Sequence, residues 1–444
     1  MKIEEYLDKL YGEAQKSGAD EFQIIYNYKE TQNWKLLQGK LEQKTNTENQ
    51  VIAIMLKKDG KIGSCYSRNL DEKAISEIIN YAMENARLID ETEENFFYDG
   101  KGVYATVEPY RPMPNKIAKL NPIEFMKDVE QEILKADKRI LPNPKITFQK
   151  NKLKQIIKNS LGINLHKENE KDFCSVFVIA KDGNDTKSNY EKIVFDKEKD
   201  FEPSYIAQKA VKKAVKHLHG IKPKSGPAKV VFAPESLISI LDYLGYCTSA
   251  YSIDKKHSQF AEKLGEVVAS PIVTIIEDPL QKGGYSTSAF DNEGVPTYKK
   301  ELISKGVLKT YLYSLKTAHK AGVKPTGNDA DSPHGSTLRN LYMEKGNISK
   351  EELLKTVENG IYVDYEVGFT DGIRSNSSGD FSFSASGFLI ENGKIGRPLE
   401  QFTVAGNYYQ MLKDIKLIAD DLEFSPYGVS SPTICVDGLT IGGK

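Results

Sequence analysis

The sequence predicts an α+β protein in which two similar helix–sheet–helix units precede a mostly β, barrel-like C-terminal domain. Three observations lead to this class. Apolar residues recur at helical spacing in segments that alternate with strand-like runs. The same order of elements occurs twice before residue 224, and glycine then recurs every few residues between β-forming side chains. The expected domains are residues 1–115, 116–223 and 224–444.

The first unit opens with a helix whose apolar side chains share one face: Ile3, Tyr6, Leu7, Leu10 and Ala14. Strand-like runs follow at 21–28, 34–41, 50–57 and 61–67. Asp59-Gly60 predicts a tight turn between the last two runs. A second helix, with an apolar stripe from Ala74 to Ile89, closes the unit.

After a proline-marked connector at 110–122, the same order returns. A helix is expected at 125–136, strands at 145–149, 153–163, 173–180 and 190–196, and a closing helix at 206–218. Asp182-Gly183 stands where Asp59-Gly60 stood, between two strands. We interpret the repeat as an internal duplication. The alternative is chance, because helix-strand-helix order is common.

The chain changes character at 222–227, where two prolines and a glycine predict a domain boundary. A strand at 229–233 and a helix at 234–244 are expected next, followed by short strands and turns. Two further helices are predicted at 350–359 and 409–417. Glycine-rich β segments of this kind build twisted sheets or partly closed barrels.

The composition describes an ordinary globular protein, with 39% hydrophobic and 28% charged residues and a net charge of −1 among 444 residues. Without a basic excess, direct binding to nucleic acid is not expected. The apolar run at 51–56 is far shorter than the ~20 residues that cross a bilayer. MKIEEYLDKL has no apolar core of the kind a secretory signal needs, so we expect a cytoplasmic protein without membrane contact.

Cysteine and histidine usage gives no metal motif. The cysteines lie far apart and are expected to be buried free thiols: Cys65, Cys174, Cys247 and Cys435. The histidines are His166, His217, His219, His257, His319 and His334. None belongs to an HExxH or HExxxH motif, which would place two imidazoles and a glutamate on one helix face. We expect His217 and His219 to interact with a helix C-terminus instead of sharing one ion.

Nucleophile and phosphate motifs are also missing from the sequence, which has neither GxSxG nor GxxxxGK[ST]. Alternating serine and phenylalanine between Ser375 and Ser386 predicts a half-buried strand. The acidic pairs Glu277-Asp278 and Asp420-Asp421 are interpreted as solvated or turn residues. Residue chemistry alone therefore shows no active site.

Several blocks of the chain resemble one family. In the third domain they are GEVVASPIVTIIEDP at 265–279, FDNEGVPT at 290–297, GVLKTYL at 306–312, PTGN at 325–328, GDFSFSASGFLIENGKI at 379–395 and VAGN at 404–407. QGKLEQ and IMLKKDGKIGSCYS add a similar pattern near the N-terminus. Together these blocks resemble the TldD/PmbA family of zinc-dependent peptide-processing proteases.

The resemblance implies the PmbA (TldE) branch, because the zinc ligands of TldD-type members have no counterpart here. Their HExxxH helix corresponds to LDYLGYC at 241–247, and their C-terminal cysteine segment to LEFSPYGVSSP at 422–432. Cys247 alone does not provide the three protein ligands of a catalytic zinc. We therefore expect no cofactor in this chain and zinc in a TldD-like partner subunit.

The implied function is that of the non-zinc subunit of a two-component metallopeptidase that processes or degrades unstructured peptides. The expected partner is a TldD-like subunit or a second copy of the chain. Peptide is expected to pair with an exposed strand edge at Gly379 to Ser386. The candidate contact residues are Gly379, Asp380, Phe381, Ser382, Phe383 and Ser384.

Two alternatives remain at this point. In the first, the chain is a protein-binding regulator of the gyrase-modulator type, acts through protein contacts and has no proteolytic role. In the second, it is a metal-independent enzyme, for which Asp291 and Asp380 are the residues to test.

Overall fold

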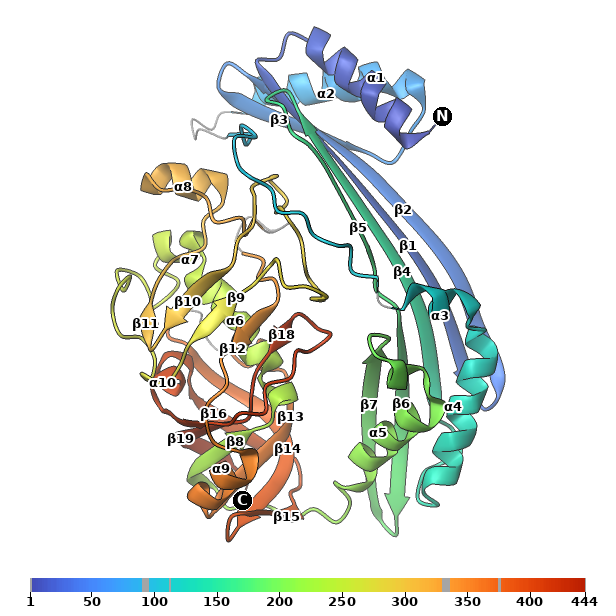
Figure 1. Cartoon of the computed structure of the whole chain (residues 1–444), viewed down its shortest axis with the longest axis vertical. Helices are drawn as coiled ribbons and strands as arrows, with labels where there is room; N and C mark the ends of the chain where they lie inside the picture. The colour runs from blue at the N-terminus through green and yellow to red at the C-terminus, as the bar shows by residue number, and fades with distance from the viewer. Residues whose placement is uncertain (1, 90–95, 112, 330–335, 374–376, 444) are drawn as a thin grey trace.

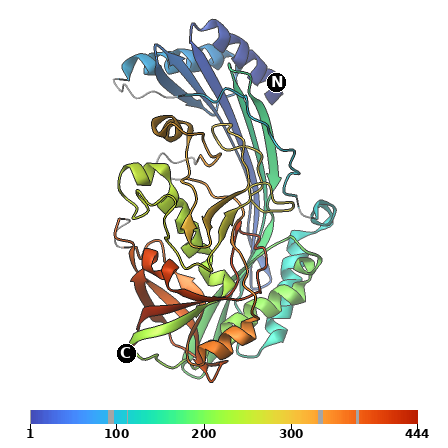
Figure 2. The ribbon, with the colours of Figure 1, turned by 60° about the vertical axis from the view of Figure 1, so that its left-hand side comes forward.

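The structure of the chain is a computed structural model that describes residues 2–89, 96–111, 113–329, 336–373 and 377–443. A long curved sheet formed by the first two hundred residues stands beside the C-terminal part of the chain (Figure 1). The C-terminal part lies along the concave side of the sheet, as the view turned by 60° also shows (Figure 2). The expected α+β class is confirmed.

The elements of the first unit are α1 (Ile3–Lys16), β1 (Glu21–Leu37), β2 (Lys40–Lys58), β3 (Lys61–Ser67), η1 (Glu72–Ala74) and α2 (Ile75–Leu88). Those of the second are α3 (Pro114–Lys119), α4 (Pro122–Ala136), β4 (Lys145–Asn159), β5 (Asn164–Glu170), β6 (Phe173–Asp182), β7 (Asp185–Val194), η2 (Glu198–Phe201) and α5 (Pro203–Val215). The repeated order of a helix, strands and a helix is present, and β5 is an additional strand that the sequence did not predict.

The strands of both units form one sheet, in the order β3-β2-β1-β4-β6-β7, with β5 also paired to β4. The units join where β1 and β4 run antiparallel, from the pair Gln23 and Asn159 to the pair Leu37 and Lys145. Two predicted units thus share a continuous sheet, and the predicted boundaries at 115/116 and 223/224 stay predictions.

The two predicted strands at 21–28 and 34–41 are wrong in their ends, because β1 is a single strand that runs from Glu21 to Leu37. Residues 29–33 carry polar side chains on both faces, so their sequence gives no alternation of apolar and polar positions. The chain turns at Gln38 and Gly39, whose φ angles are 50° and 70°, inside the second predicted strand. The predicted turns at Asp59-Gly60 and Asp182-Gly183 are confirmed by the hairpins β2–β3 and β6–β7.

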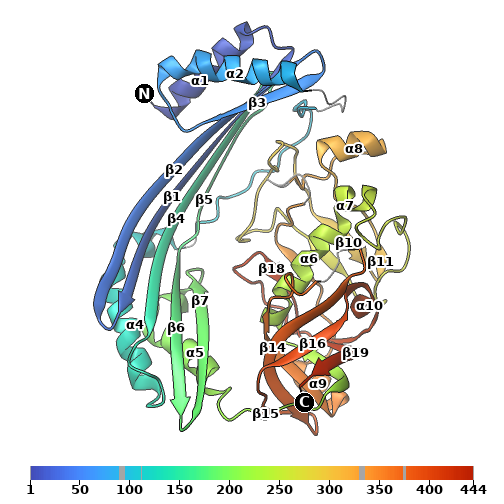
Figure 3. The ribbon, with the colours of Figure 1, turned by 180° about the vertical axis from the view of Figure 1, so that it is seen from behind.

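The sheet uses its two faces differently. Even-numbered side chains of β1 face the helices: Phe22 and Ile24 pack with α1 and α2, and Trp34 packs with α4 and α5. On the opposite face Ile25 belongs to an apolar cluster that includes Phe290 of the C-terminal part. This alternation, which follows from the two-residue period of a strand, directs one face of the sheet toward the C-terminal part (Figure 3).

The C-terminal part begins with β8 (Gly226–Phe232), η3 (Pro234–Leu237), α6 (Ile238–Thr248) and α7 (Ala250–Asp254). A small sheet follows, in the order β11 (Val307–Leu308), β10 (Lys300–Ser304), β9 (Ile275–Glu277), β12 (Leu341–Met343) and β18 (Val429–Ser430). The further helices are α8 (Leu315–Ala321), α9 (Lys350–Val357) and α10 (Tyr408–Lys413). Predicted helices at 234–244 and 350–359 correspond to η3 with α6 and to α9. The helix predicted at 409–417 corresponds to α10 but is wrong at its end, because residues 415–417 belong to strand β17 (Ile415–Ile418).

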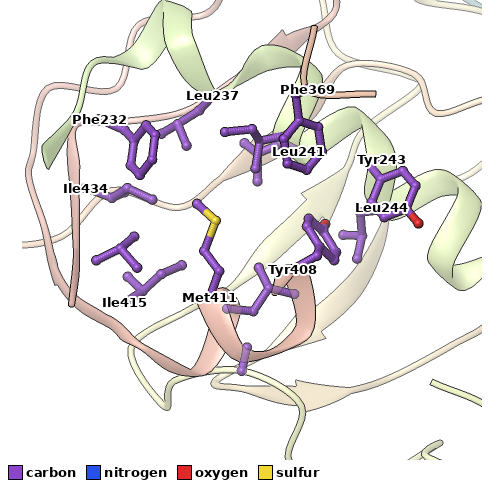
Figure 4. Close-up of a cluster of buried hydrophobic side chains, with 14 of the residues drawn as sticks. Phe232, Leu237, Leu241, Tyr243, Leu244, Phe369, Tyr408, Met411, Ile415 and Ile434 are labelled. Atoms are coloured by element: carbon purple, nitrogen blue, oxygen red, sulfur yellow. The ribbon is translucent and has the colours of Figure 1, made fainter. Parts of the chain in front are cut away.

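The remaining strands are β13 (Gly360–Val367), β14 (Asp380–Glu391), β15 (Lys394–Pro398), β16 (Phe402–Asn407), β17 (Ile415–Ile418) and β19 (Ile434–Gly442). Five strands, β8, β19, β16, β14 and β13, pair in that order, and β13 pairs with β8 to close the ring. β15 pairs with β14 and β17 pairs with β19 outside the ring. The expected barrel-like domain is therefore present. Its core joins Phe232, Leu241, Phe369, Tyr408 and Met411, which meet beside α6 (Figure 4).

A search for membrane-spanning segments among the described residues finds no helix with the length and apolar character to cross a bilayer.

Candidate functional site

The helix that follows the first strand of the barrel carries few zinc-binding side chains. In the stretch from Leu241 to Cys247, Asp242 and Cys247 are the residues of types that bind zinc. Cys247 is fully buried, and burial raises the pKa of its thiol to about 12. The thiol is therefore protonated in the metal-free chain, and it is the small number of donors that disfavours zinc here.

Aromatic side chains surround this helix instead of metal ligands. The rings of Tyr243 and Tyr408 meet edge to face, with centroids 4.9 Å apart, and Tyr243 also contacts Phe369 (Figure 4). Among the described residues, no three histidine, cysteine, aspartate or glutamate side chains gather as a metal site would require. The residues present beside α6 do not fit a zinc ion.

The segment predicted to bind peptide lies in the wall of the barrel. Gly379 precedes β14, and Asp380 to Ser384 form its first half. The expected exposed edge is wrong, because β14 pairs with β16 on one side from Asp380 to Ala385 and with β13 on the other from Ser384 onward. The backbone N–H of Ser382 also donates to the carbonyl of Gly372. Among the described residues, pairing on both sides of β14 therefore leaves little edge for an added peptide strand.

The side chains of that segment have different environments. Phe381 and Phe383 are buried in the barrel core, whereas Ser382 and Ser384 point the other way and are half-buried. Asp380 is exposed and accepts a hydrogen bond of 2.9 Å from Asn407 Nδ2. Binding of peptide by these residues through their side chains stays a prediction.

The other residues singled out in the sequence stay apart from one another. His217 and His219 lie beyond the end of α5, and their Nε2 atoms contact different carboxylates, Asp364 at 3.3 Å and Asp182 at 3.0 Å. A shared ion between them is not supported, and these side-chain contacts with Asp364 and Asp182 are present where contact with the helix terminus was expected. Cys174 and Cys435 are buried as expected, but Cys65 is only partly buried. His334 and Ser375 lie outside the described residues.

Residues from three of the family-like blocks, or close to them, meet with Arg339 in a buried polar cluster. The Glu277 carboxylate is fully buried, 2.8 Å from Lys300 Nζ, and accepts hydrogen bonds of 2.8 and 2.9 Å from Asn328 Nδ2. The backbone N–H of Arg339 donates to the same carboxylate at 3.0 Å. The interpretation of Glu277 as a solvated acid is wrong, because pairing with Lys300 permits its burial.

Asp291 forms a second part of this cluster. Its fully buried carboxylate accepts backbone hydrogen bonds from Glu293, Val295 and Asp329 at 2.9 to 3.0 Å. Burial raises the pKa of Asp291, and these donors and the charge of Arg339 oppose that increase. Asp291 thus fixes the loop at 291–295 and is not poised as an acid or base facing solvent.

A cavity of about 480 Å³ opens between the concave face of the sheet and the loops that this cluster holds. The sheet contributes Asn27, Tyr28, Lys29, Asn49, Val51, Leu153, Lys154, Gln155, Lys167, Asn169 and Lys171, and the loops contribute Ser286, Thr287, Ser288, Asn292, Thr337, Leu338 and Arg339. Its size is typical of ligand sites, ~300 to 1,000 Å³. The sequence did not predict this cavity, because strand lysines such as Lys154 and Lys167 have the pattern of a solvent-exposed sheet face.

The C-terminal loops are fixed beside this cavity to the sheet and to the segment at 96–111. Tyr104 donates its hydroxyl hydrogen to the Gly294 carbonyl at 2.7 Å, and Ile157 packs with Ala289 and Phe290. At the other end the ring of Tyr110 contacts that of Tyr285, with centroids 5.2 Å apart. The cavity is therefore bounded by packed contacts.

Comparison with known proteins finds consistent relatives. Residues 225–443 match the PmbA/TldA metallopeptidase C-terminal domain. Metalloprotease PmbA of Escherichia coli O157:H7 is 26% identical over 388 residues, which cover 87% of this chain and 84% of the relative. A metalloprotease of Methanocaldococcus jannaschii is 27% identical, with 90% of each chain covered.

Solved structures resemble the whole chain. A Thermotoga maritima protein assigned as a modulator of a DNA gyrase has a TM-score of 0.90 at 30% identity, covering 99% of this chain and 100% of the other. TldE from Thermococcus kodakarensis shares the fold, with a TM-score of 0.83 at 20% identity over 99% of this chain and all of the other.

Proposed function

Since the chain belongs to the PmbA/TldD family of metallopeptidases, we propose that it is a PmbA/TldE-like subunit of a TldD-type zinc metallopeptidase that processes or degrades unstructured peptides in the cytoplasm. The TldD-like partner supplies zinc and the catalytic base. This chain contributes a wall of the shared chamber and holds peptide.

The character of α6 carries this proposal. A catalytic zinc needs three protein ligands and an open position. Here the helix offers the buried thiol of Cys247 and the carboxylate of Asp242, with the aromatic rings of Tyr243 and Tyr408 beside them. The rest of the domain keeps the family-like blocks and their buried cluster around Glu277. A chain that keeps the domain but offers, among its described residues, no fitting set of zinc donors suits a supporting subunit.

The sheet offers the means to hold peptide. β5 pairs with β4 on one side. The segment at 96–111 binds the C-terminal end of its outer edge, because the Glu170 N–H donates to the Tyr110 carbonyl at 2.8 Å and the Tyr110 N–H donates to Asn169 Oδ1 at 3.0 Å. Among the described residues no other backbone hydrogen bond from outside the sheet reaches this edge. An extended peptide can add to such an edge through main-chain hydrogen bonds, without a sequence-specific pocket. Lys167 and Asn169 of β5 line the cavity, so a peptide on this edge enters it.

The test is reconstitution. This chain and a TldD-type subunit from the same host are assayed separately and together on an unstructured peptide. We expect cleavage that requires both chains and is lost when a chelator removes zinc from the partner. Zinc-dependent cleavage by this chain alone would contradict the proposal.

The competing function is a protein-binding regulator without a proteolytic role, in keeping with the assignment of the Thermotoga relative. The reconstitution separates the two functions, because a regulator would bind its target protein yet leave peptide cleavage by the TldD-type subunit unchanged. The same assay with Asp291→Asn and Asp380→Asn variants tests for a metal-independent activity of this chain.

A further inference from the structure

The cavity between the sheet and the C-terminal loops has a strongly positive lining. Its cationic side chains are Lys29, Lys154, Lys167, Lys171 and Arg339, and no carboxylate is among the described residues that line it. The remaining lining is mostly amide and hydroxyl side chains, which can bond to a peptide backbone. A chain with a net charge of −1 has thus concentrated cations in one concave site.

Several of these cations have no acidic partner. Lys154 pairs with Glu4 at 2.8 Å, and Lys167 lies 5.2 Å from the centroid of the Phe290 ring. For Lys29, Lys171 and Arg339, by contrast, the described part of the chain contains no carboxylate oxygen within ion-pair distance. Their charges are available to a ligand.

Lys171 and Arg339 are the best placed of the three. The ammonium of Lys171 lies 3.9 Å from the centroid of the Tyr285 ring, which gives it a cation–π contact but no counter-charge. Burial, followed by the charges of Lys192 and Arg339, lowers the pKa of Lys171 to about 8. A desolvated cation beside other cations is unfavourable until an anion joins it.

Arg339 is held rigidly at the same wall. Its side chain is only 5% exposed, and Nη1 donates to the Gly327 carbonyl at 3.3 Å. The nearby carboxylates are already engaged, since Glu277 pairs with Lys300 and Asp291 accepts three backbone hydrogen bonds. A preorganised guanidinium of this kind suits recognition of a carboxylate.

We propose that this cavity binds a carboxylate of the peptide substrate between Lys171 and Arg339, while the peptide backbone lies along the outer edge of β5. The carboxylate comes from an acidic side chain or from the peptide C-terminus. The proposal rests on the peptide-holding role given above, and it adds a preference for acidic peptides. Lys167 of β5 and Lys171 both line the cavity, so a peptide that enters along the free, N-terminal part of that edge brings its side chains toward the two cations.

The test measures binding of three pentapeptides, labelled at the N-terminus with an uncharged dye, to the purified full-length chain. The first is Ala-Gly-Glu-Gly-Ala amide, the second has glutamine in place of glutamate, and the third is the glutamine peptide with a free C-terminal carboxylate. We expect the first or third to bind about tenfold more tightly than the second, as a charge-assisted contact implies. Whichever does so identifies the source of the carboxylate.

Lys171→Gln should remove this preference and leave the affinity for the glutamine amide unchanged. Lys171→Arg, which keeps the charge, should retain it. Lys44→Gln is the matched control, because Lys44 is exposed on β2 and lies outside the cavity. Circular dichroism confirms that each variant is folded.

Equal affinity for all three peptides would overturn the proposal, as would a Lys171→Gln variant that weakens all of them equally. Inorganic phosphate at 10-fold excess over its own Kd serves as a competitor. If phosphate binds through Lys171 while the peptides are not distinguished, the peptide assignment is wrong. The peptide-binding test needs neither the partner subunit nor zinc. If the chain prefers acidic peptides but reconstitution with the TldD-type subunit gives no cleavage, the subunit role is refuted and the carboxylate site stands.

Discussion

The Lys300 ammonium lies 2.8 Å from the Glu277 carboxylate, and both side chains are almost fully removed from water, with exposures of 5% and 0%. Asn328 and the Arg339 backbone complete the bonding of the carboxylate. This pair joins β9 to β10 and holds the loops that form one wall of the cavity.

Removing one member of this pair should destabilise the chain strongly. In Lys300→Met the Glu277 charge remains buried without its partner, which costs about 3 to 5 kcal/mol of unfolding free energy. Urea denaturation measures the loss. The control is Lys320→Met, which breaks the exposed ion pair with Asp254 and should cost less than about 1 kcal/mol. A Lys300→Met chain as stable as this control would show that Glu277 is not charged in the folded state.

Binding of an acidic peptide should depend on pH through Lys171. The pKa of this amine is lowered to about 8 by burial and by the facing cations Lys192 and Arg339. Its positive charge is nearly complete at about pH 6 and is lost as the pH rises through about 8. Affinity should therefore be nearly constant between about pH 6 and 7, where the peptide carboxylate is also ionised, and fall as the pH rises through about 8. Bound carboxylate favours the charged form and moves the midpoint upward. The Lys171→Arg variant should lose this dependence, because arginine stays charged.

Thiol reactivity should separate Cys65 from the other cysteines. Cys247 and Cys435 are buried, and burial raises the pKa of each to about 12. We expect a thiol reagent at pH 8 to label Cys65 in the native chain and the other cysteines only after denaturation. Cys65→Ser should abolish the native reaction. Rapid native labelling of Cys247 would contradict the burial of the thiol beside α6.

The barrel should not tolerate a side chain at Gly387. A Cβ atom there would lie 1.9 Å from the Tyr362 carbonyl oxygen on β13, so Gly387→Ala must separate two paired strands. We expect a loss of several kcal/mol in urea denaturation. In Gly12→Ala, by contrast, the new Cβ meets nothing within 4 Å on α1, and alanine should stabilise that helix by up to about 1 kcal/mol. Equal effects of the two substitutions would contradict the close approach of β13 and β14.

The sequence predicted the parts of this fold where apolar residues repeat with a clear period. The stripe of Leu7 and Leu10 marked α1, and Asp59-Gly60 marked the turn before β3. Residues 29–33 of β1 escaped prediction because both of their faces are polar. β5 was missed for the same reason, since its last five residues, HKENE at 166–170, are all polar and show no alternation.

The candidate site was harder to predict than the fold. The segment Gly379 to Ser386 looked like an edge because glycine and serine are small, but which strands flank β14 depends on residues far away in sequence. The cavity joins lysines of β1, β4 and β5 to Arg339, and only the tertiary structure brings them together. Glu277 looked like a surface acid because its partner Lys300 lies 23 residues away.

The central claim is that catalysis by this chain requires a zinc-bearing relative. Native mass spectrometry of the tagged chain, purified gently from its own host, tests it most directly. We expect a complex of this chain with an HExxxH-containing relative and zinc in that relative. A homodimer with zinc bound stoichiometrically to this chain would contradict it.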